Sequence, residues 1–351
     1  MFKFLKLSFA FLIAFAFSTA LQPFGFDPVA VISVGFLASF IPMPSGVFAA
    51  GINVEIWQKT IIENLFKNNE FLLNSQDVSS AVVGGRIVHK PNAGAASGVV
   101  RNRTILPATV KRRADLDLVY TLDEFTSNPI LLTDAEKYEL SYDKTTNVLA
   151  TDMANIRQSM AEWILYSWRA ETATNLIATT GGAVAAYLTG QTGNRKAFEL
   201  KNLSEAQARL DEQDVPAEDR FALFDARMYQ QFVDALSATQ YRDFSAGLDK
   251  EKGIVGEMYG FKIMKRSSVL RYTSAGVALT PEEATAATTN TACLIWQKNM
   301  VERALGDVKM FESKGEPTMY GDVYSFLVNG GGSKSRYDKK GVLAIVQAAS
   351  A

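Results

Sequence analysis

Few side chains in this sequence are well suited to chemistry, because it contains one histidine and one cysteine. His89 lies in RIVHKP, whose alternating pattern predicts a strand. A histidine base needs an oriented partner, so a histidine on the surface of a strand is the simpler interpretation. Cys293 lies in the apolar run TACLIW, whereas a reactive thiolate needs an open, electropositive setting. We therefore expect a buried, inert thiol.

Two other patterns resemble functional motifs, a phosphate-binding loop and a pair of acidic residues, but their spacing does not fit such a function. The run GGGSKS, Gly330 to Ser335, resembles a phosphate loop, but the Walker pattern has glycine directly before lysine and here Ser333 intervenes. We expect a flexible loop there. The acidic pair Asp123-Glu124 is adjacent in sequence, so on a strand its side chains point to opposite faces. The sequence predicts no catalytic residue, no metal or cofactor site, and no enzyme.

Composition limits the remaining classes. The chain has 351 residues, of which 48% are hydrophobic and 21% charged, enough apolar material for one large or two medium globular domains. Thirty-six basic residues face 37 acidic ones, so no overall field favours nucleic acid or an acidic substrate. A single cysteine excludes an intramolecular disulfide and a thiolate metal cluster.

The first 50 residues are strongly apolar and leave three alternatives open. The stretch MFKFLKLSFAFLIAFAFSTA has two lysines, an apolar run and a small-residue end, which is typical of a secretory signal or an anchor. The apolar character continues past Ala20, which also fits a segment that packs inside an assembly. A third alternative is that translation starts at Met43.

A long two-stranded arm is predicted after the N-terminal region. Strict alternation from Asp115 to Leu122 indicates a half-exposed strand, and the glycine-rich part between Pro91 and Val100 indicates a long connection. A basic stretch on this arm is followed by an acidic one. The basic residues are Arg101, Arg103, Lys111, Arg112 and Arg113, and the acidic ones include Asp123 and Glu124.

Two amphipathic helices are predicted on either side of the arm. The first covers residues 52–72. The second begins at Thr151 or Asp152 and runs to about Ile177, before Gly181-Gly182. Its apolar residues recur at three-to-four spacing and are Ile156, Met160, Trp163, Ile164 and Trp168.

A second region of short elements follows. Ser204-Glu205-Ala206-Gln207 has the capping-box pattern that opens a helix, which we expect to stop before Pro216. Residues 220–224 read as a buried strand and 228–236 as a helix. In GIVGEMYGFKIMKRSSVL, two alternating segments flank Tyr259-Gly260, which predicts a hairpin. The runs TACLIWQK and VERALGDVKMFES predict strands, and the last part predicts strand, exposed loop, strand.

This order of elements resembles the major capsid proteins of tailed bacteriophages, which have the Hong Kong 97 coat fold shared with encapsulins. The resemblance covers residues 51–348 and depends on the order of DRFALFDARMYQQFVDAL, GIVGEMYGFKIMKRSSVL, TACLIWQKNMVERAL and RYDKKGVLAIV. It implies an α+β fold with an N-terminal arm, an extended β-hairpin called the E loop, a long spine helix, and peripheral and axial domains.

The resemblance also implies that the arm lies over an adjacent subunit, where its opposite charges can set the register between subunits. The residues that we expect at such an interface are Arg101, Arg103, Lys111, Arg112, Arg113, Asp123 and Glu124.

A division of the chain is implied as well. The expected parts are an apolar segment of uncertain role (1–50), the N-terminal arm (51–80), the E loop with peripheral-domain strands (81–145), the peripheral domain with the spine helix (146–215), the axial domain (216–335), and a strand that returns to the peripheral domain (336–351).

The function implied by the resemblance is structural. Hexamers and pentamers of one polypeptide would form an icosahedral phage head around double-stranded DNA, which the shell would contact without sequence specificity. Scaffold, portal or decoration proteins are the other expected partners, and membrane contact of the first segment is left open. The expected locations are the virion and, during assembly, the host cytoplasm. The alternatives are an encapsulin-like compartment and a secreted or membrane-anchored binding protein.

Overall fold

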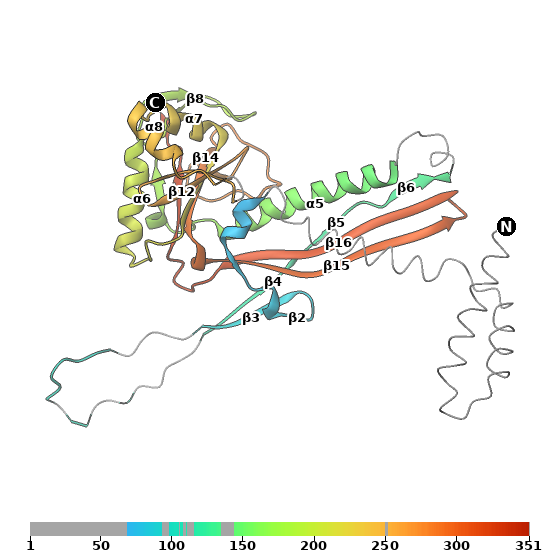
Figure 1. Ribbon diagram of the computed structural model, residues 1–351, viewed down its shortest axis with the longest axis horizontal. Helices are drawn as coiled ribbons and strands as arrows, with labels where there is room; N and C mark the ends of the chain where they lie inside the picture. Colours follow the sequence, from blue (N-terminus) through green and yellow to red (C-terminus); the bar gives the residue numbers. More distant parts are fainter. Residues whose placement is uncertain are drawn as a thin grey trace, which may run out of the picture. The chain divides into compact units, whose positions relative to one another are not determined.

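The computed structural model describes residues 69–92, 98–104, 106–107, 110, 116–134, 144–249 and 252–350. The chain divides into two compact units, residues 1–57 and 58–351, and every described residue belongs to the second. The N-terminal segment 1–50 and most of the helix expected at 52–72 therefore lie outside the described residues. Within the described ranges, no helix combines the length and apolar character that a bilayer-spanning helix needs. Helices and strands are mixed along the chain, as the α+β prediction requires (Figure 1).

The largest sheet of the described chain has seven strands. Its strand order is β11-β12-β10-β14-β17-β7, and β13 pairs with β14. The strands are β7 (Leu176–Ala178), β10 (Arg220–Asp225), β11 (Ile254–Met258), β12 (Phe261–Arg266), β13 (Leu270–Tyr272), β14 (Asn290–Gln297) and β17 (Val342–Val346). The pairs β10·β12 and β17·β7 are parallel, and the others are antiparallel.

Both faces of this sheet are covered, which explains why every residue of β10 and β14 is buried. Helices α6 (Leu200–Glu212), α7 (Ala226–Asp234) and α8 (Ala238–Ser245) pack on one face, where Phe232 and Phe244 contact each other. On the other face, Trp296 stacks on Phe221 and lies 5.7 Å, centroid to centroid, from Trp168. The continuous apolar pattern of these strands thus reflects two buried faces.

The hairpin predicted at Tyr259-Gly260 is confirmed. Strands β11 and β12 pair antiparallel with Met258 opposite Phe261, so two residues make the turn. Tyr259 and Gly260 have φ angles of 52° and 71°, and a type I′ turn requires positive φ at both positions.

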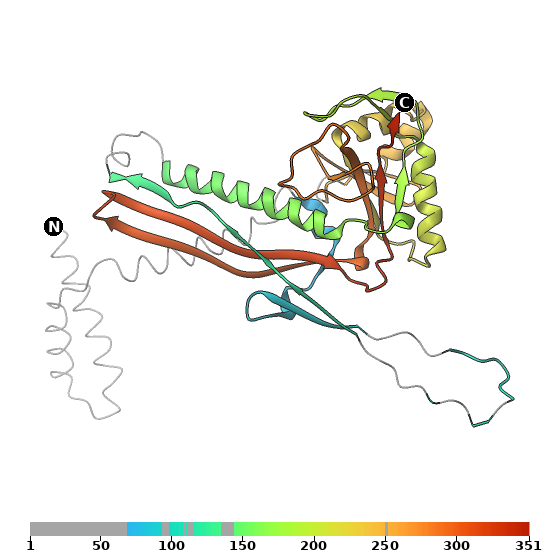
Figure 2. The same cartoon turned by 180° about the vertical axis from the view of Figure 1, so that it is seen from behind.

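A second, five-stranded sheet contains the longest strands of the described chain. It comprises β1 (Gln76–Asp77), β15 (Val301–Glu316), β16 (Gly321–Lys334), β5 (Asp123–Thr126) and β6 (Ile130–Thr133). Strands β15 and β16 form one antiparallel hairpin, and both β5 and β6 pair with β16. Figures 1 and 2 show helix α5 (Lys144–Trp168) lying along this hairpin.

Helix α5 carries the predicted apolar stripe but has different ends. Its buried residues include Ile156, Met160, Ile164 and Trp168. At about 1.5 Å per residue, its 25 residues span about 37 Å. The helix begins at Lys144 and ends at Trp168, so the expected extension to Ile177 is wrong. Residues 176–178 instead pair in parallel with residues 344–346 of β17, and this pairing replaces the helix.

Two small sheets and four short 3-10 helices complete the described elements. One sheet has β2 (Val82–Val83), β3 (Ile87–Asn92) and β4 (Leu116–Thr121), and the other has β8 (Ala183–Ala185), β9 (Asn194–Lys196) and β18 (Ala349–Ser350). The 3-10 helices are η2 (Glu70–Asn74), η3 (Ser79–Ala81), η4 (Ala173–Asn175) and η5 (Lys298–Met300). The antiparallel pair β3·β4 confirms the two strands predicted for the arm.

Several sequence-based expectations need correction. The helix predicted to open at Ser204 is capped by Glu199, which exchanges a reciprocal capping box with Asn202. The expected loop at Gly330 to Ser335 is wrong, because Gly330 to Lys334 are the last residues of strand β16.

The sheets also group residues differently from the expected domain ranges. The β15–β16 hairpin was placed with residues 216–335, yet it pairs with β5 and β6. The expected return strand, β17, pairs with β14 in the seven-stranded sheet. The domain boundaries themselves stay predictions.

Candidate functional site

The described residues contain no group of three or more potential metal ligands. His89 lies on the surface of a strand and Cys293 is buried, as the sequence predicted. His89 lies on β3 with its side chain 48% exposed, and its Nδ1 is 3.4 Å from Asp117 Oδ2. Cys293 is fully buried in β14, where burial raises the pKa of its thiol well above the ordinary value. The arm and the contacts that hold it are the remaining candidates for a functional surface.

The β3·β4 pair has a buried face and an exposed face. Val88 is fully buried and lies opposite Tyr120, whereas Ile87 and Val119 are 40% and 48% exposed. Alternate residues of a strand point to opposite faces, so one face packs on the body of the chain and the other is open.

Beyond this pair, the described aliphatic residues of the arm are strongly exposed. Val99 and Val110 are 96% and 94% exposed, and Leu106 is 78% exposed. Aliphatic side chains this exposed, within one short segment, are typical of a surface that another molecule covers. The arm is therefore the first candidate for an assembly contact.

Some of the basic residues expected at a subunit interface belong to the described part of the arm. Arg101 and Arg103 are described and exposed on the arm. Lys111, Arg112 and Arg113 lie outside the described residues.

The acidic members of that set lie on strand β5 and contact their own chain. Asp123 accepts a hydrogen bond from Trp163 Nε1 of α5, and Glu124 lies 3.5 Å from Arg86. Asp123 and Glu124 therefore help to hold β5 in place, and their role between subunits stays a prediction.

An ion pair with a buried carboxylate holds strand β3, at the base of the arm, against strand β15. Lys90 of β3 pairs with Glu302 of β15, whose side chain is 0% exposed, and Lys90 Nζ also donates to Ser335 Oγ at 3.0 Å. Burial raises the pKa of nearby Tyr120, and the charge of Glu302 adds to that shift. Three segments distant in sequence thus meet beneath the arm.

Two glycines, Gly330 and Gly332, let helix α5 approach strand β16 closely, whereas Gly331 between them lies against Leu122. A Cβ atom on Gly332 would lie 2.6 Å from the Glu302 carbonyl oxygen and 2.9 Å from Trp168 Nε1. A Cβ on Gly330 would lie 2.6 Å from Met160 Sδ. Trp168 Nε1 donates to the Glu302 carbonyl at 2.8 Å across this contact. The run that resembles a phosphate loop is in fact a packing surface.

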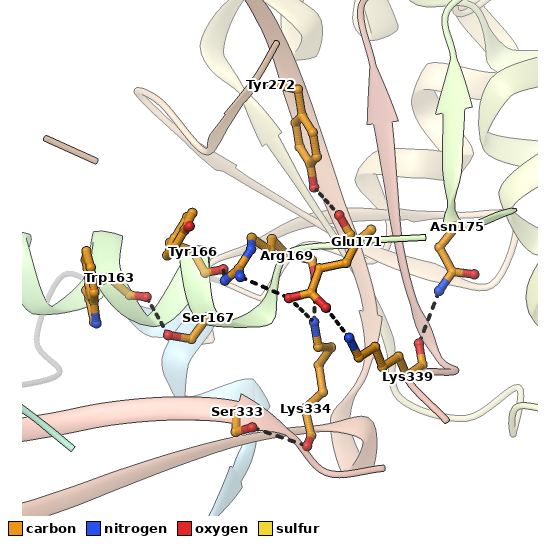
Figure 3. Close-up of polar contacts among 11 residues, drawn as sticks. Trp163, Tyr166, Ser167, Arg169, Glu171, Asn175, Tyr272, Ser333, Lys334 and Lys339 are labelled. Carbon is orange, nitrogen blue, oxygen red and sulfur yellow. Dashed lines mark hydrogen bonds and ion pairs between the residues drawn. The ribbon is translucent and has the colours of Figure 1, made fainter. Parts of the chain in front are cut away.

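Glu171 joins the end of α5 to the end of β16 (Figure 3). Its carboxylate pairs with Arg169 at 3.0 Å, with Lys334 at 3.2 Å and with Lys339. Lys334 Nζ also donates to the Arg169 carbonyl at 3.0 Å. Next to it, Tyr272 of the seven-stranded sheet donates to the Ala170 carbonyl at 3.1 Å. This cluster, which we call the Glu171 junction, connects the two large sheets.

The Glu171 junction predicts a defined pH dependence. Burial alone would raise the pKa of the Glu171 carboxyl, but hydrogen bonds from Lys339 and Lys334 and the neighbouring positive charges outweigh it and hold the pKa below its ordinary value of 4.5. A carboxyl with a depressed pKa stabilises the fold at neutral pH, and this contribution is lost as pH falls below about 4.5 through the lowered pKa. We expect Glu171→Gln to lower the free energy of unfolding at pH 7 by about 1–2 kcal/mol, with a difference from the parent that shrinks in acid. Urea unfolding from pH 7 to pH 3 measures it.

A matched control is Glu205→Gln, which removes an exposed i,i+4 pair with Arg209. Such pairs contribute about 0.3–0.5 kcal/mol, so this variant should stay close to the parent. An equal loss in both variants, or a Glu171→Gln difference that does not depend on pH, would contradict the assignment.

No protein-family model matches the chain, and no curated protein is similar to it in sequence. Solved structures are similar. The capsid structure of cyanophage P-SCSP1u has 19% identity and a TM-score of 0.54, over 79% of this chain and 87% of that chain. The capsid of Ralstonia phage GP4 has 10% identity and a TM-score of 0.56, over 79% and 88%. The cyanophage Pam1 capsid has 9% identity and a TM-score of 0.53, over 78% and 88%.

At these identities the likeness establishes the fold. The chain has the fold of tailed-phage capsid proteins, the Hong Kong 97 coat fold that the order of elements predicted. Local patterns in the sequence correctly predicted the arm strands, the apolar stripe of the long helix and the Tyr259-Gly260 hairpin. It missed the Glu171 junction and the glycine contact, because both depend on segments far apart in sequence.

Proposed function

We propose that this chain is a major capsid protein that assembles with copies of itself into a closed shell. The observation that carries the proposal is the shared fold over nearly four fifths of the chain, since the three similar structures named above are all phage capsids. Hexamers and pentamers of one polypeptide close into an icosahedral head, and the arm lies over an adjacent subunit. The exposed aliphatic residues of the arm support that role, because a neighbouring copy would cover them.

The proposal includes the expected surroundings of such a shell. The head encloses double-stranded DNA, which it contacts through phosphates without reading sequence. The protein is made in the host cytoplasm and ends in the virion, with scaffold, portal or decoration proteins as further partners. No catalytic step is part of this function. The capsids among the similar structures favour a phage head over an encapsulin-like compartment.

Assembly of the purified full-length chain tests this function. We expect closed particles of uniform diameter in negative-stain electron microscopy and a fast-sedimenting species in ultracentrifugation, over a range of salt and protein concentrations. A single-copy species under all these conditions would contradict it. Mass spectrometry of the N-terminus addresses the secreted alternative, for which the chain would be processed after Ala20 and remain a monomer.

A further inference from the structure

A row of short polar contacts joins the small sheet β8-β9-β18, at the C-terminal end of the chain, to the seven-stranded sheet (Figure 1). The hydroxyl of Tyr187, between β8 and β9, contacts Oδ2 of Asp225, the last residue of β10. The same hydroxyl lies 2.6 Å from Oγ1 of Thr291 in β14. Thr291 Oγ1 in turn lies 2.7 Å from Oε1 of Gln347, which precedes β18. We call this row the Asp225 chain.

The Asp225 chain is enclosed. Asp225 and Thr291 are each 3% exposed, and Gln347 is fully buried. The second carboxyl oxygen of Asp225, Oδ1, accepts a hydrogen bond from the Met228 backbone N–H at 2.7 Å and so caps helix α7. The three contacts are direct, oxygen to oxygen, so the hydrogen atoms within them must come from the four side chains themselves.

Counting hydrogen atoms shows which protonation state fits this geometry. Two oxygens at 2.6–2.7 Å need one hydrogen atom between them. Tyr187 and Thr291 each carry one hydroxyl hydrogen, whereas an amide oxygen only accepts. An ionised Asp225 therefore leaves one of the three contacts without a hydrogen atom. A protonated Asp225 supplies it: the carboxyl donates to Tyr187, and Tyr187 donates to Thr291. Thr291 then donates to Gln347.

The ionised carboxylate fits a second arrangement of the same side chains. Nε2 of Gln347 is buried and has no hydrogen-bond partner among the described residues. If the amide turns over, Nε2 donates to Thr291, and both hydroxyls reverse so that Tyr187 donates to Asp225. The two protonation states of Asp225 thus correspond to two directions of one hydrogen-bonded row, which differ in the orientation of the Gln347 amide.

The charged groups around Asp225 do not neutralise it. No described cation lies at ion-pair distance from its carboxyl group. Arg227, on α7, is exposed. Arg266, the register partner of Asp225 on β12, pairs instead with Glu162 at 3.5 Å. On β14, burial raises the pKa of the Cys293 thiol, which keeps it neutral. An ionised Asp225 would be a buried charge without a counter-charge, and such a charge is costly.

The direction of the pKa shift agrees with this count. Burial raises the pKa of the Asp225 carboxyl above its ordinary value of 3.8, although hydrogen bonds from Tyr187 and Met228 act against the shift. Burial and the Asp225 charge also raise the pKa of Tyr187, which therefore remains a hydroxyl. A carboxyl with a raised pKa stabilises the fold most below its ordinary pKa, and this contribution is lost as pH rises through the raised value.

We propose that Asp225 is a proton switch: its ionisation reverses the Asp225 chain, turns the Gln347 amide and loosens the sheet β8-β9-β18 on the seven-stranded sheet. Arg195 of β9 donates to the carbonyls of Ala287 and Thr289 in either state, so the small sheet loosens without detaching. The switch goes beyond the shell function and does not depend on it, because it lies within one chain.

Infrared titration of the purified full-length chain tests the proton directly. The C=O stretch of a protonated carboxyl disappears on ionisation, and the difference between the parent and Asp225→Asn isolates the band of Asp225. We expect this band to titrate with a midpoint above 3.8. Gln347→Leu should lower the midpoint by about one unit, the size of one hydrogen bond, because Thr291 then has no acceptor in the protonated state. A midpoint at or below 3.8, or one that Gln347→Leu leaves unchanged, would overturn the switch.

Hydrogen exchange measures the loosening. Between about pH 4 and about pH 8, the protection factors of residues 183–196 and 347–350 should fall at least about tenfold in the parent. They should stay constant in Asp225→Asn, whose amide can donate to Tyr187 as the protonated carboxyl does. The exposed carboxylate variant Asp243→Asn, on α8, should behave as the parent does. The hairpin β15–β16, which is not part of the row, should keep its protection throughout.

The same pH dependence in the parent and in Asp225→Asn, or an equal loss of protection in β15–β16, would refute the switch. Thermal unfolding of each variant checks the fold, and if Gln347→Leu does not fold, the comparison of the parent with Asp225→Asn decides alone. The shell function is tested separately by particle formation, so either proposal can fail while the other holds.

Discussion

Replacing Gly332 with valine is expected to destabilise the fold by about 3 kcal/mol, because overpacking of a tight contact costs 1–3 kcal/mol and here a hydrogen bond is lost as well. The new side chain would meet the Glu302 carbonyl oxygen, 2.6 Å from the Cβ position, and the indole of Trp168. Helix α5 would have to move away from strand β16. Urea unfolding of the unassembled protein and its soluble yield measure the effect.

The matched control is Gly182→Val. A Cβ atom at Gly182 has no heavy atom within 4 Å, so the same substitution meets no clash there. We expect a change in unfolding free energy within about 0.5 kcal/mol, as for other surface substitutions. A stable Gly332→Val protein would show that α5 does not depend on this close approach.

Replacing Lys90 with methionine is the second change with a large expected effect. It leaves the fully buried carboxylate of Glu302 without its counter-charge, and breaking a buried pair in this way costs about 3–5 kcal/mol. The loss should appear in urea unfolding, and it should also increase hydrogen exchange in β3, since Lys90 ties that strand to β15.

The double variant Lys90→Met with Glu302→Leu distinguishes charge from packing. Replacing both members of a buried pair with apolar residues is often neutral, so the double variant should recover most of the stability. A double variant as unstable as the single one would mean that the hydrogen bonds from Lys90 to Ser335 and Gln76 matter more than the charge pair.

The correctly predicted features depend on residues that are close together in the sequence. The Tyr259-Gly260 hairpin depends on two adjacent residues that accept positive φ, and the stripe on α5 depends on a spacing of three to four. The alternation around residues 116–121 likewise predicted strand β4. In each case the pattern repeats within a dozen residues, so it can be found without knowing what packs against it.

The wrong predictions concern features that depend on segments far apart in the sequence. Residues 176–178 continue an apolar pattern and were assigned to the helix, but pairing with β17, over 160 residues later, makes them a strand. The glycines 330–332 have the composition of a flexible loop, yet they lie in β16, where Gly330 and Gly332 leave room for α5 and Gly331 lies against Leu122.

The sequence alone determined the type of most elements, their order, and through that order the capsid fold. Only the tertiary structure decided which strands pair, where α5 ends, and which charges meet at Lys90 and Glu171. The physical reason is that hydrophobic periodicity specifies which face of an element is buried, a local property of the chain. The partner that covers this face, and the ion pairs formed at the contact, depend on segments that meet only when the whole chain has folded.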